Sequence, residues 1–377
     1  MAVWSYPTRI VFGAGEARRA GEEARALGVA RALLVTDAGV ERAGLVTPVR
    51  ESLERAGLAV ATFAGVSPNP TEADVSAGAE ALRAHAADGI VCLGGGSPID
   101  AGKLIAVRAA TSASWEELDD ARDGGHLVPK QLVPVIALPT TAGTGSEVGR
   151  AGVLTVASTG RKTVVFAPQL LPRVAILDPE LTVGLPASVT AATGFDALTH
   201  CVEAYLAPGD HPMADAIALA GVDLVAKFLG RAVADARNLE ARGAMLKAAM
   251  MGAVAFQKGL GACHSLAHPL SSELGLHHGL ANALCLPAVL DFNEPVALER
   301  ILHLSLLLGG DAERGACAHT VRALRGSLGL PSGLAAVGVE PAQLDRLATL
   351  AHEDACHRSN PRECSRDDLL ELYRRSR

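Results

Sequence analysis

The stretch Gly194-Phe-Asp-Ala-Leu-Thr-His200 opens the half of the chain that holds most of its histidines. Asp196 and His200 are four residues apart, so on a helix their side chains project from one face, a turn apart. The same spacing recurs in His264-Ser-Leu-Ala-His268, and His277-His278 follows. One carboxylate and several imidazoles from three segments are a plausible ligand set for a divalent metal ion.

A simpler interpretation of these histidines is also open. A helical histidine four residues from an aspartate is often a surface pair or a satisfied, partly buried side chain. The residues around His264 are mostly small and apolar, however, and an unsatisfied polar group buried among them costs about 1–3 kcal/mol. A metal ion is a suitable partner. Spacing alone does not choose between His264 and His268, or between His277 and His278.

Helical periodicity continues through the chain after Leu185-Pro186, where strand-like segments cease. We expect helices near residues 189–205, 214–229, 239–257, 265–274, 278–293, 295–308, 314–328, 341–354 and 366–374. The sequence therefore predicts an all-helical domain over residues 185–377 that carries the metal-binding candidates. A chain of 377 residues suits two domains.

The first half alternates strand-like and helix-like segments. We expect strands near residues 9–12, 32–36, 59–63, 89–93, 133–138, 153–156, 162–166 and 174–178, with helices near 16–26, 47–56, 72–86 and from Pro98. Thr71 is the expected N-cap of the third of these helices. This alternation predicts a Rossmann-like parallel sheet with helices on both faces over residues 1–184.

Two glycine-rich loops follow strands of that sheet, Gly94-Gly-Gly-Ser-Pro-Ile-Asp100-Ala-Gly-Lys103 and Pro139-Thr-Thr-Ala-Gly-Thr-Gly-Ser-Glu147. Glycines let the backbone approach a phosphate, and a helix N-terminus offers its free N–H groups to the anion. Neither loop fits the usual fingerprints, because GxGxxG is missing and Leu104 follows Lys103 where a P-loop needs Ser or Thr. Two such loops in one sheet still predict a pyrophosphate-bearing ligand.

Asp37 ends an early strand of the same sheet. Its carboxylate can accept hydrogen bonds from a ribose hydroxyl pair, and its charge repels a 2′-phosphate, which favours NAD over NADP. A cap at the strand end is the alternative interpretation of Asp37, and nothing local decides between the two.

Composition narrows the classes of function. The net charge of −7 is spread along the chain and aromatic residues make up 3%, which disfavours nucleic acid and anionic membranes as partners. No apolar run reaches the length of a membrane span. Seven cysteines are scattered without a CxxC pair, which is typical of a reduced, cytoplasmic protein.

Further motifs are Asp178-Pro-Glu180, the extension of the first stretch to Tyr205, His278-Gly-Leu-Ala-Asn282 and Asn360-Pro-Arg362. With the two loops, they resemble the iron-containing (group III) alcohol dehydrogenases over nearly the whole chain, and most of all the lactaldehyde reductase (1,2-propanediol oxidoreductase) type. The resemblance implies a dehydroquinate synthase-like pair of domains. It also implies a metal-dependent, NAD(H)-linked enzyme that interconverts a small primary alcohol or diol and its aldehyde or ketone, as a homo-oligomer, most simply a dimer.

The resemblance also implies roles for individual residues. Four would hold Fe²⁺, or alternatively Zn²⁺: Asp196, His200, His264 and His278. His268 would be a proton-relay residue, and Cys356 would line the substrate entrance. Dinucleotide contacts would come from Asp37, Asn69, Gly95, Gly96, Ser97, Asp100, Thr140, Thr141, Thr144, Val153 and Lys162.

The chain departs from close relatives before the first metal histidine. They carry a substrate-channel aromatic just before Gly-Leu-Gly, where this chain has Ala255-Phe-Gln-Lys258, so the ring is shifted by one residue or the pocket is wider. His357, directly after Cys356, is expected to face solvent; the alternative is that it brings polarity to the substrate entrance. Alternative functions are polyol oxidation of the glycerol dehydrogenase type and a synthase without net redox, although the histidines have few basic neighbours for a phosphorylated or carboxylated substrate. A metal-dependent hydrolase would leave the two glycine-rich loops without a role. A non-catalytic regulator would leave the four metal-ligand positions without one.

Overall fold

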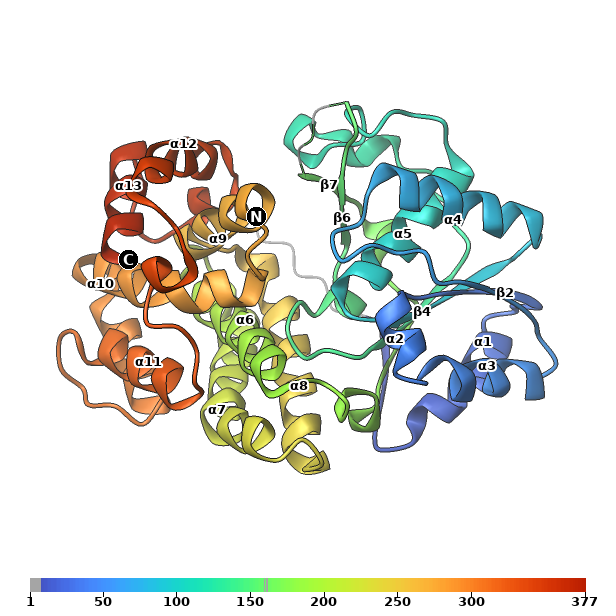
Figure 1. Ribbon diagram of the computed structural model, residues 1–377, viewed down its shortest axis with the longest axis horizontal. Coiled ribbons are helices and arrows are strands. Elements are labelled where there is room, and N and C mark those ends of the chain that lie inside the picture. Colours follow the sequence, from blue (N-terminus) through green and yellow to red (C-terminus); the bar gives the residue numbers. More distant parts are fainter. Residues whose placement is uncertain (1–7, 159, 161) are drawn as a thin grey trace. The chain divides into compact units, whose positions relative to one another are not determined.

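The computed structural model describes residues 8–158, 160 and 162–377 (Figure 1). These residues divide into two compact units. The sheet unit contains residues 8–141 and 145–184, and the helical unit contains residues 142–144 and 185–377. Residues 1–7, 159 and 161 of the predicted first domain lie outside the described part. Residues 142–144 pack with the helices because Gly143 lies so near Thr193 that a Cβ atom on it would be 3.0 Å from the Thr193 side chain.

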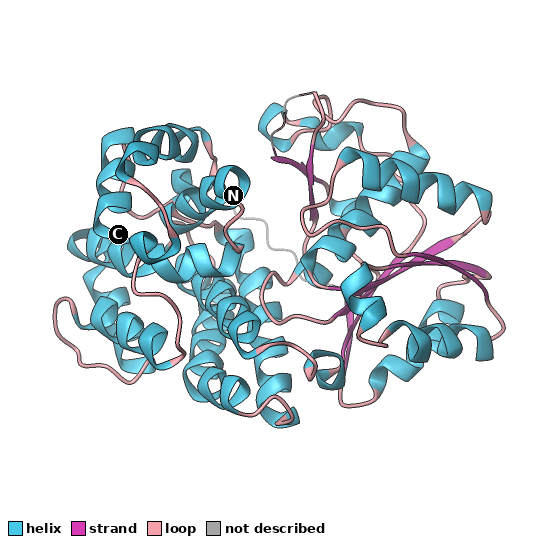
Figure 2. Ribbon diagram, viewed as in Figure 1, coloured by secondary structure: helices cyan, strands magenta, loops and turns pink. Residues whose placement is uncertain are grey.

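A six-stranded sheet forms the centre of the sheet unit, drawn in magenta in Figure 2. Its strands, in spatial order, are β1 (Arg9–Phe12), β8 (Val174–Leu177), β5 (Val135–Pro139), β4 (Gly89–Gly94), β2 (Arg31–Val35) and β3 (Ala59–Phe63). Every pairing is parallel. β4 and β5 are buried along their whole length, as expected for continuous apolar runs covered on both faces. The predicted parallel sheet is confirmed.

Helices cover both faces of this sheet. They are α1 (Ala20–Ala26), α2 (Ala38–Arg42), α3 (Val46–Arg55), α4 (Glu72–Ala84) and α5 (Gly96–Ala110). Side chains alternate across the sheet, so Leu34 joins a core with residues of α1 and α3, while Leu33 joins a second core with residues of α4 and α5. Thr71 caps α4 in a capping box with Asp74.

The strand order creates a switch point between β2 and β4. From β2 the chain runs outward to β3 and then returns to β4 on the other side of β2. In open α/β sheets such a reversal leaves a crevice at the carboxyl ends of the two strands, where ligands bind. Asp37 follows β2 and the first glycine-rich loop follows β4, so both predicted cofactor elements lie at this edge.

The remaining strands, β6 (Ala151–Thr155) and β7 (Lys162–Phe166), form a separate antiparallel pair. Thr155 bridges to Thr71, and its N–H donates to the Pro70 carbonyl at 2.7 Å. The pair is thereby attached to the loop before α4. The strand-like pattern at these positions is correct, but the strands extend no part of the main sheet.

The helical unit consists of α6 (Ala187–Leu206), α7 (Pro212–Ala234), α8 (Leu239–Ala255), α9 (Ala262–Leu274), α10 (His278–Leu307), α11 (Ala316–Ser327), α12 (Leu344–Glu353) and α13 (Arg366–Arg375). α6 packs against α7, α8 and α10 and is buried from Thr190 to Leu206. The all-helical character of this half is confirmed. The two helices expected at 278–293 and 295–308 are present as two helical segments of α10, which meet at a kink where Ala297 leaves helical backbone angles (φ −130°, ψ 30°), two residues after Pro295.

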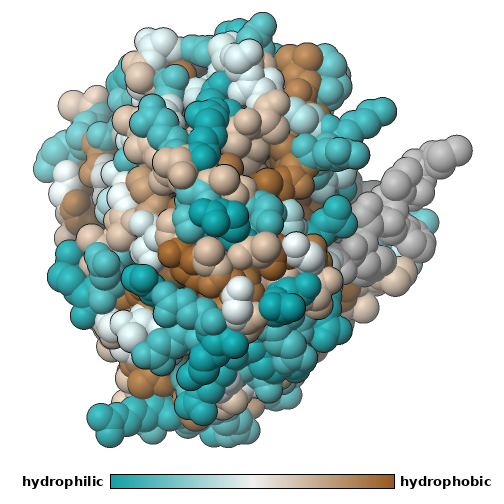
Figure 3. Space-filling view, turned by 90° about the vertical axis from the view of Figure 1, so that its right-hand side faces the viewer, coloured by the Kyte–Doolittle hydropathy of each residue, from teal (hydrophilic) through white to brown (hydrophobic). Residues whose placement is uncertain are grey.

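The outer surface of the sheet unit is mixed in character. Figure 3 shows hydrophilic side chains spread over one side of the molecule, with smaller apolar groups between them. Among the described residues, none of the helices combines the length and the apolar character that crossing a membrane requires.

Candidate metal centre and cofactor loops

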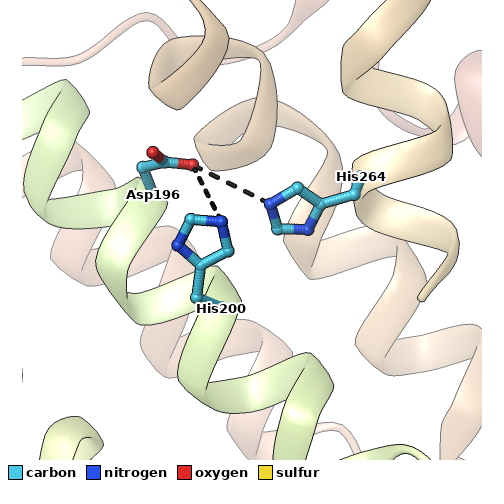
Figure 4. Close-up of side chains that lie close together, drawn as sticks. All are labelled: Asp196, His200 and His264. Carbon is cyan, nitrogen blue, oxygen red and sulfur yellow. Dashed lines mark ion pairs between the residues drawn. The ribbon is translucent and has the colours of Figure 1, made fainter. Parts of the chain in front are cut away.

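Three helices bring one carboxylate and three imidazoles together inside the helical unit. Asp196 and His200 lie one turn apart on α6, and His264 lies on α9 with its ring facing them (Figure 4). Asp196 Oδ1 is 3.9 Å from His200 Nε2 and 3.9 Å from His264 Nε2. His278, the first residue of α10, places its Nε2 3.5 Å from the same oxygen.

These separations fit ligands that share one cation. Two ligand atoms bound about 2.1 Å from a metal at tetrahedral angles are about 3.4 Å apart. The ligand atoms of Asp196, His200 and His264 all lie within 4.8 Å of one another, and these residues are buried. A carboxylate with neutral imidazoles suits Zn²⁺ or Fe²⁺ better than Mg²⁺ or Ca²⁺, which prefer oxygen ligands throughout.

The protonation of the cluster follows from burial and neighbouring charge. Burial alone would raise the pKa of Asp196, but the surrounding histidines and the Asn282 amide outweigh it and hold this pKa below its usual value. Burial lowers the pKa of His200 to about 4 and takes that of His278 well below its usual value. Asp196 is therefore an anion beside two neutral imidazoles, which is the form that binds metal.

Two residues outside the proposed ligand set orient it. Glu203 Oε2 lies 2.5 Å from His264 Nδ1, so Nε2 of this histidine faces the cluster, while Glu203 Oε1 accepts the Cys263 N–H at 2.6 Å. The Glu203 charge outweighs burial and raises the pKa of His264. Asn282 donates its side-chain amide to Asp196 Oδ1 at 2.9 Å. Such partners fix the orientation of metal ligands.

Glu203 was not singled out from the sequence, although a signal was present. It follows His200 by three residues in a helix that is otherwise mostly apolar, so it lies on the same face. A third charged or metal-binding side chain on one buried face of a helix is costly unless it has a partner.

His268 and His277 do not belong to the proposed set of four metal ligands. The His268 ring stacks on the His278 ring at a centroid distance of 5.2 Å, and its Nδ1 lies 2.7 Å from Asp354 Oδ2. His277 is the exposed N-cap residue of α10. The arrangement thus directs His264 rather than His268, and His278 rather than His277, toward Asp196. Spacing alone did not make either choice.

Cys356, expected at the substrate entrance, lies close to His268 and Asp354, and His357 follows it in the chain. Cys356 is partly buried, and its thiol lies within 4.8 Å of ligand atoms of His268 and Asp354. Burial and then the Asp354 charge raise its pKa well above the usual value, so the thiol is protonated. The expectation of a solvent-facing His357 is wrong: its side chain is buried, with Nδ1 3.4 Å from Ser265 Oγ and its ring stacked on His352.

Phe256 settles where the aromatic ring before Gly-Leu-Gly lies. Its ring is 5.1 Å from the His200 ring and tilted by 57° to it. The side chain therefore forms an apolar wall directly beside a proposed metal ligand, even though the stretch Ala255–Lys258 differs from the pattern of close relatives.

In the sheet unit, the two glycine-rich loops pack against each other. The Thr140 N–H donates to the Gly94 carbonyl at 2.9 Å, and a Cβ atom on Gly95 would come within 3.2 Å of the Thr141 hydroxyl. Helix α5 begins at Gly96, two residues before the expected start, because Gly95 takes the N-cap position. Ser97 Oγ donates to the Pro68 carbonyl at 2.6 Å and so anchors the loop that carries Asn69.

The acidic and basic cofactor candidates of this unit are engaged in internal contacts. Asp100 accepts the Ser146 hydroxyl at 2.5 Å and the Val153 N–H at 3.3 Å, and its charge acts on the nearby Lys162. Asp37 caps α2, accepting the N–H groups of Gly39 and Val40 through Oδ1. The capping interpretation of Asp37 is therefore confirmed, and its contact with a ribose stays a prediction. Thr144 belongs to the helical unit, not to the sheet unit.

Comparison with known proteins identifies the class and then the family. A solved 1,3-propanediol oxidoreductase superposes with a TM-score of 0.95 at 36% identity, over 100% of both chains. The protein is thus an alcohol dehydrogenase in class, an oxidoreductase that acts on CH–OH groups. The family model of iron-containing alcohol dehydrogenase matches residues 7–179, and that of its C-terminal domain matches residues 190–377. The chain belongs to the iron-containing alcohol dehydrogenase family, as the sequence predicted.

Two relatives are similar to this chain over nearly their full length. A 4-hydroxybutyrate dehydrogenase of Cupriavidus necator is 41% identical, with 100% of each chain covered. An NAD-dependent methanol dehydrogenase of Bacillus methanolicus is 37% identical, with 98% of each chain covered. The predicted activity on small alcohols is confirmed at the level of the family.

Proposed function

We propose that the protein oxidises a small primary alcohol or diol with NAD⁺, or reduces the corresponding aldehyde with NADH, at a metal held by Asp196, His200, His264 and His278. The observation that carries this proposal is the convergence of three imidazole Nε2 atoms on Asp196 Oδ1 at 3.5–3.9 Å. A divalent cation, Fe²⁺ or alternatively Zn²⁺, would supply a Lewis acid for the substrate oxygen.

The sheet unit is proposed to bind the dinucleotide at the switch point between β2 and β4. Gly95, Gly96 and the N-terminus of α5 offer backbone N–H groups to the pyrophosphate. Asp37, at the end of β2, adds a negative charge that opposes a 2′-phosphate, so NAD is preferred over NADP. The family relationship supports the same cofactor, since one of its relatives is named as NAD-dependent.

A residue of this chain is also proposed to accept the proton that the substrate hydroxyl group loses. Oxidation of an alcohol carbon releases a hydride to the nicotinamide and a proton from the hydroxyl group. His268 stacks on His278 and is partly exposed, so it is proposed to accept that proton and pass it to solvent. Phe256 beside His200 supplies an apolar wall that favours a small, mostly apolar substrate carbon chain.

The substrate itself is open within this class. The relatives named above are a 4-hydroxybutyrate dehydrogenase and a methanol dehydrogenase, and the sequence resembles the lactaldehyde reductase type without fixing the substrate. We propose further that the protein works in the cytoplasm, where its seven free cysteines stay reduced, and that it assembles as a homodimer, as the family resemblance implies.

A substrate panel on metal-loaded protein tests the proposal. Protein stripped of metal is reloaded with Fe²⁺ under argon or with Zn²⁺ and is assayed with methanol, short diols, 4-hydroxybutyrate and glycerol. We expect metal-dependent NADH formation equal to the aldehyde or ketone formed. Metal-loaded protein that produces no NADH with any alcohol, or that turns over a substrate without net NADH, would contradict the proposal; the second outcome would favour a synthase.

A further inference from the structure

His268 is held by a carboxylate distant in sequence. Its Nδ1 lies 2.7 Å from Oδ2 of Asp354, the residue that follows α12. The two side chains are 37% and 22% exposed, so the pair is partly shielded from water but accessible. The His268 ring is also stacked on His278 at an interplanar angle of 17°, which limits its rotation.

Asp354 is itself fixed by donors on its other oxygen. Oδ1 accepts the Ser265 hydroxyl at 2.7 Å and the Cys356 N–H at 2.8 Å. Ser265 in turn accepts the His357 N–H at 2.8 Å. With Oδ1 occupied in this way, Oδ2 is turned toward His268. Burial would raise the pKa of Asp354, but the interaction with His268 and then the hydrogen bonds from Ser265 and Cys356 outweigh it and hold this pKa well below its usual value, so Asp354 is an anion.

We propose that Asp354 is a positioning residue that fixes the tautomer and orientation of His268, with the proton on Nδ1 and the lone pair on Nε2. An anionic oxygen at hydrogen-bond distance from Nδ1 accepts an N–H there and so leaves Nε2 as the acceptor. This inference rests on the proposed function, because it assigns the lone pair a task in that reaction.

The proton balance of the step is simple. As the substrate carbon gives its hydride to the nicotinamide, the O–H bond of the alcohol breaks and an N–H bond forms at His268 Nε2. The imidazolium that results is stabilised by the Asp354 anion, and the Nε2 proton then leaves to solvent. Reduction of the aldehyde runs the same transfers in reverse.

Asp354→Asn is the informative substitution. The Asn Oδ1 can keep the Ser265 and Cys356 donors, which leaves its NH₂ group facing His268 Nδ1. That nitrogen must then be the acceptor, so the proton moves to Nε2 and the lone pair is lost where it is needed. We expect kcat to fall about 100-fold, within the range for one general acid–base group. The KM for the alcohol and the bound metal should stay unchanged.

The tautomer can be measured without turnover. Long-range ¹⁵N–¹H NMR of histidine-labelled, zinc-loaded protein at one fixed pH should show His268 protonated at Nδ1 in the wild type and at Nε2 in Asp354→Asn, with His268→Asn to identify the signal. The matched control is Glu273→Gln, on α9, the helix that also carries His268. It removes a carboxylate that pairs with Arg346 and should alter neither the tautomer of His268 nor kcat.

The outcomes separate this inference from the proposed function. An Nε2-protonated His268 in the wild type, or an Asp354→Asn enzyme with wild-type tautomer and kcat, overturns the positioning role. The expected tautomer switch in a protein that oxidises no alcohol contradicts the proposed function instead. Should Asp354→Asn not fold, Ser265→Ala loosens the same carboxylate, and a smaller fall in kcat with a mixed tautomer is expected. Unchanged values in that variant also overturn the inference.

Discussion

The two units prepare for their ligands in opposite ways. In the helical unit, the candidate site consists of side chains, and four proposed ligand groups converge there. Glu203 holds His264 at Nδ1, the ring nitrogen away from the cluster, whereas the Asn282 amide lies among the ligand atoms, 2.9 Å from Asp196 Oδ1 and 3.3 Å from His278 Nε2. In the sheet unit, the candidate site consists of backbone, because the glycine-rich loops offer their N–H groups. The side chains of Asp100 and Ser97 are hydrogen-bonded to other parts of the same unit, Asp100 to Ser146 and Ser97 to the Pro68 carbonyl.

This difference reflects the ligands. A small dication needs several donors within about 2 Å, which only converging side chains provide. A dinucleotide spreads its charge over a pyrophosphate that backbone groups at a helix N-terminus can bind, provided that no side chain blocks the approach. We therefore expect single substitutions to be severe in the helical site and graded in the sheet unit.

His264→Ala should have the largest effect. It removes one of the four proposed ligands and leaves Glu203 without its imidazole partner inside the protein. We expect loss of both metal retention and alcohol oxidation, measured by elemental analysis and NADH formation. His319→Ala, which truncates an exposed histidine of α11, is the control and should keep both. A His264→Ala enzyme that is active without metal would refute the ligand assignment.

Glu147→Gln tests a buried charge of the sheet unit. Burial raises the pKa of Glu147 to about 7, and its Oε1 meets no hydrogen-bond partner among the residues that the structure describes. A carboxyl pKa that is raised on folding contributes stability below the unfolded value of about 4.5, and this stability is lost as the pH rises through 7. The wild type is therefore destabilised at alkaline pH, by about 3 kcal/mol for a shift of this size.

The Gln variant carries no such charge. Its free energy of unfolding should exceed that of the wild type by up to about 3 kcal/mol at pH 8.5, and the difference should vanish near pH 4.5. Urea denaturation across this pH range measures it. Glu51→Gln, at an exposed carboxylate of the same unit, should show no such pH dependence. Equal stabilities of Glu147→Gln and wild type at pH 8.5 would show that the buried carboxyl is compensated.

Glu203→Gln tests the support behind the metal ligands. The amide keeps the volume but loses the anion that accepts the His264 Nδ1 proton at 2.5 Å. Substitution of such a partner typically weakens metal binding about 10–100-fold. Competition with a chromogenic chelator gives the metal Kd without an activity assay. Glu299→Gln, at an exposed carboxylate of α10, should leave the Kd unchanged. Wild-type affinity in Glu203→Gln would reduce this residue to a cap of α9.

The sequence predicted what depends on local spacing and missed what depends on packing. The i, i+4 pair Asp196–His200 could be placed on one helix face because periodicity fixes that face. Spacing could not choose His264 over His268, since both lie on α9 and only the approach of α6 decides which ring meets Asp196. Asp354 could not be found at all, because 86 residues separate it from His268.

Errors in the elements have similar causes. Helix α2 is five residues long, too short for a helical period to show. Pro295 suggested a boundary between two helices, and the break lies two residues later, at Ala297, because a proline disturbs the helix without fixing the residue at which it ends. For His357, polarity suggested solvent, whereas the hydroxyl of Ser265 and the ring of His352 provide partners that no local pattern reveals.

The smallest predicted effect concerns Asp37, which caps α2 and is proposed to oppose a 2′-phosphate as well. Asp37→Ser keeps an oxygen that can cap α2 and removes only the charge. One charge pair near the surface is worth about 1 kcal/mol, so kcat/KM for NADP relative to NAD should rise about fivefold. Asp119→Ser, at another capping aspartate of the same unit, should leave this ratio unchanged. An unchanged ratio in Asp37→Ser would mean that Asp37 serves only as a cap.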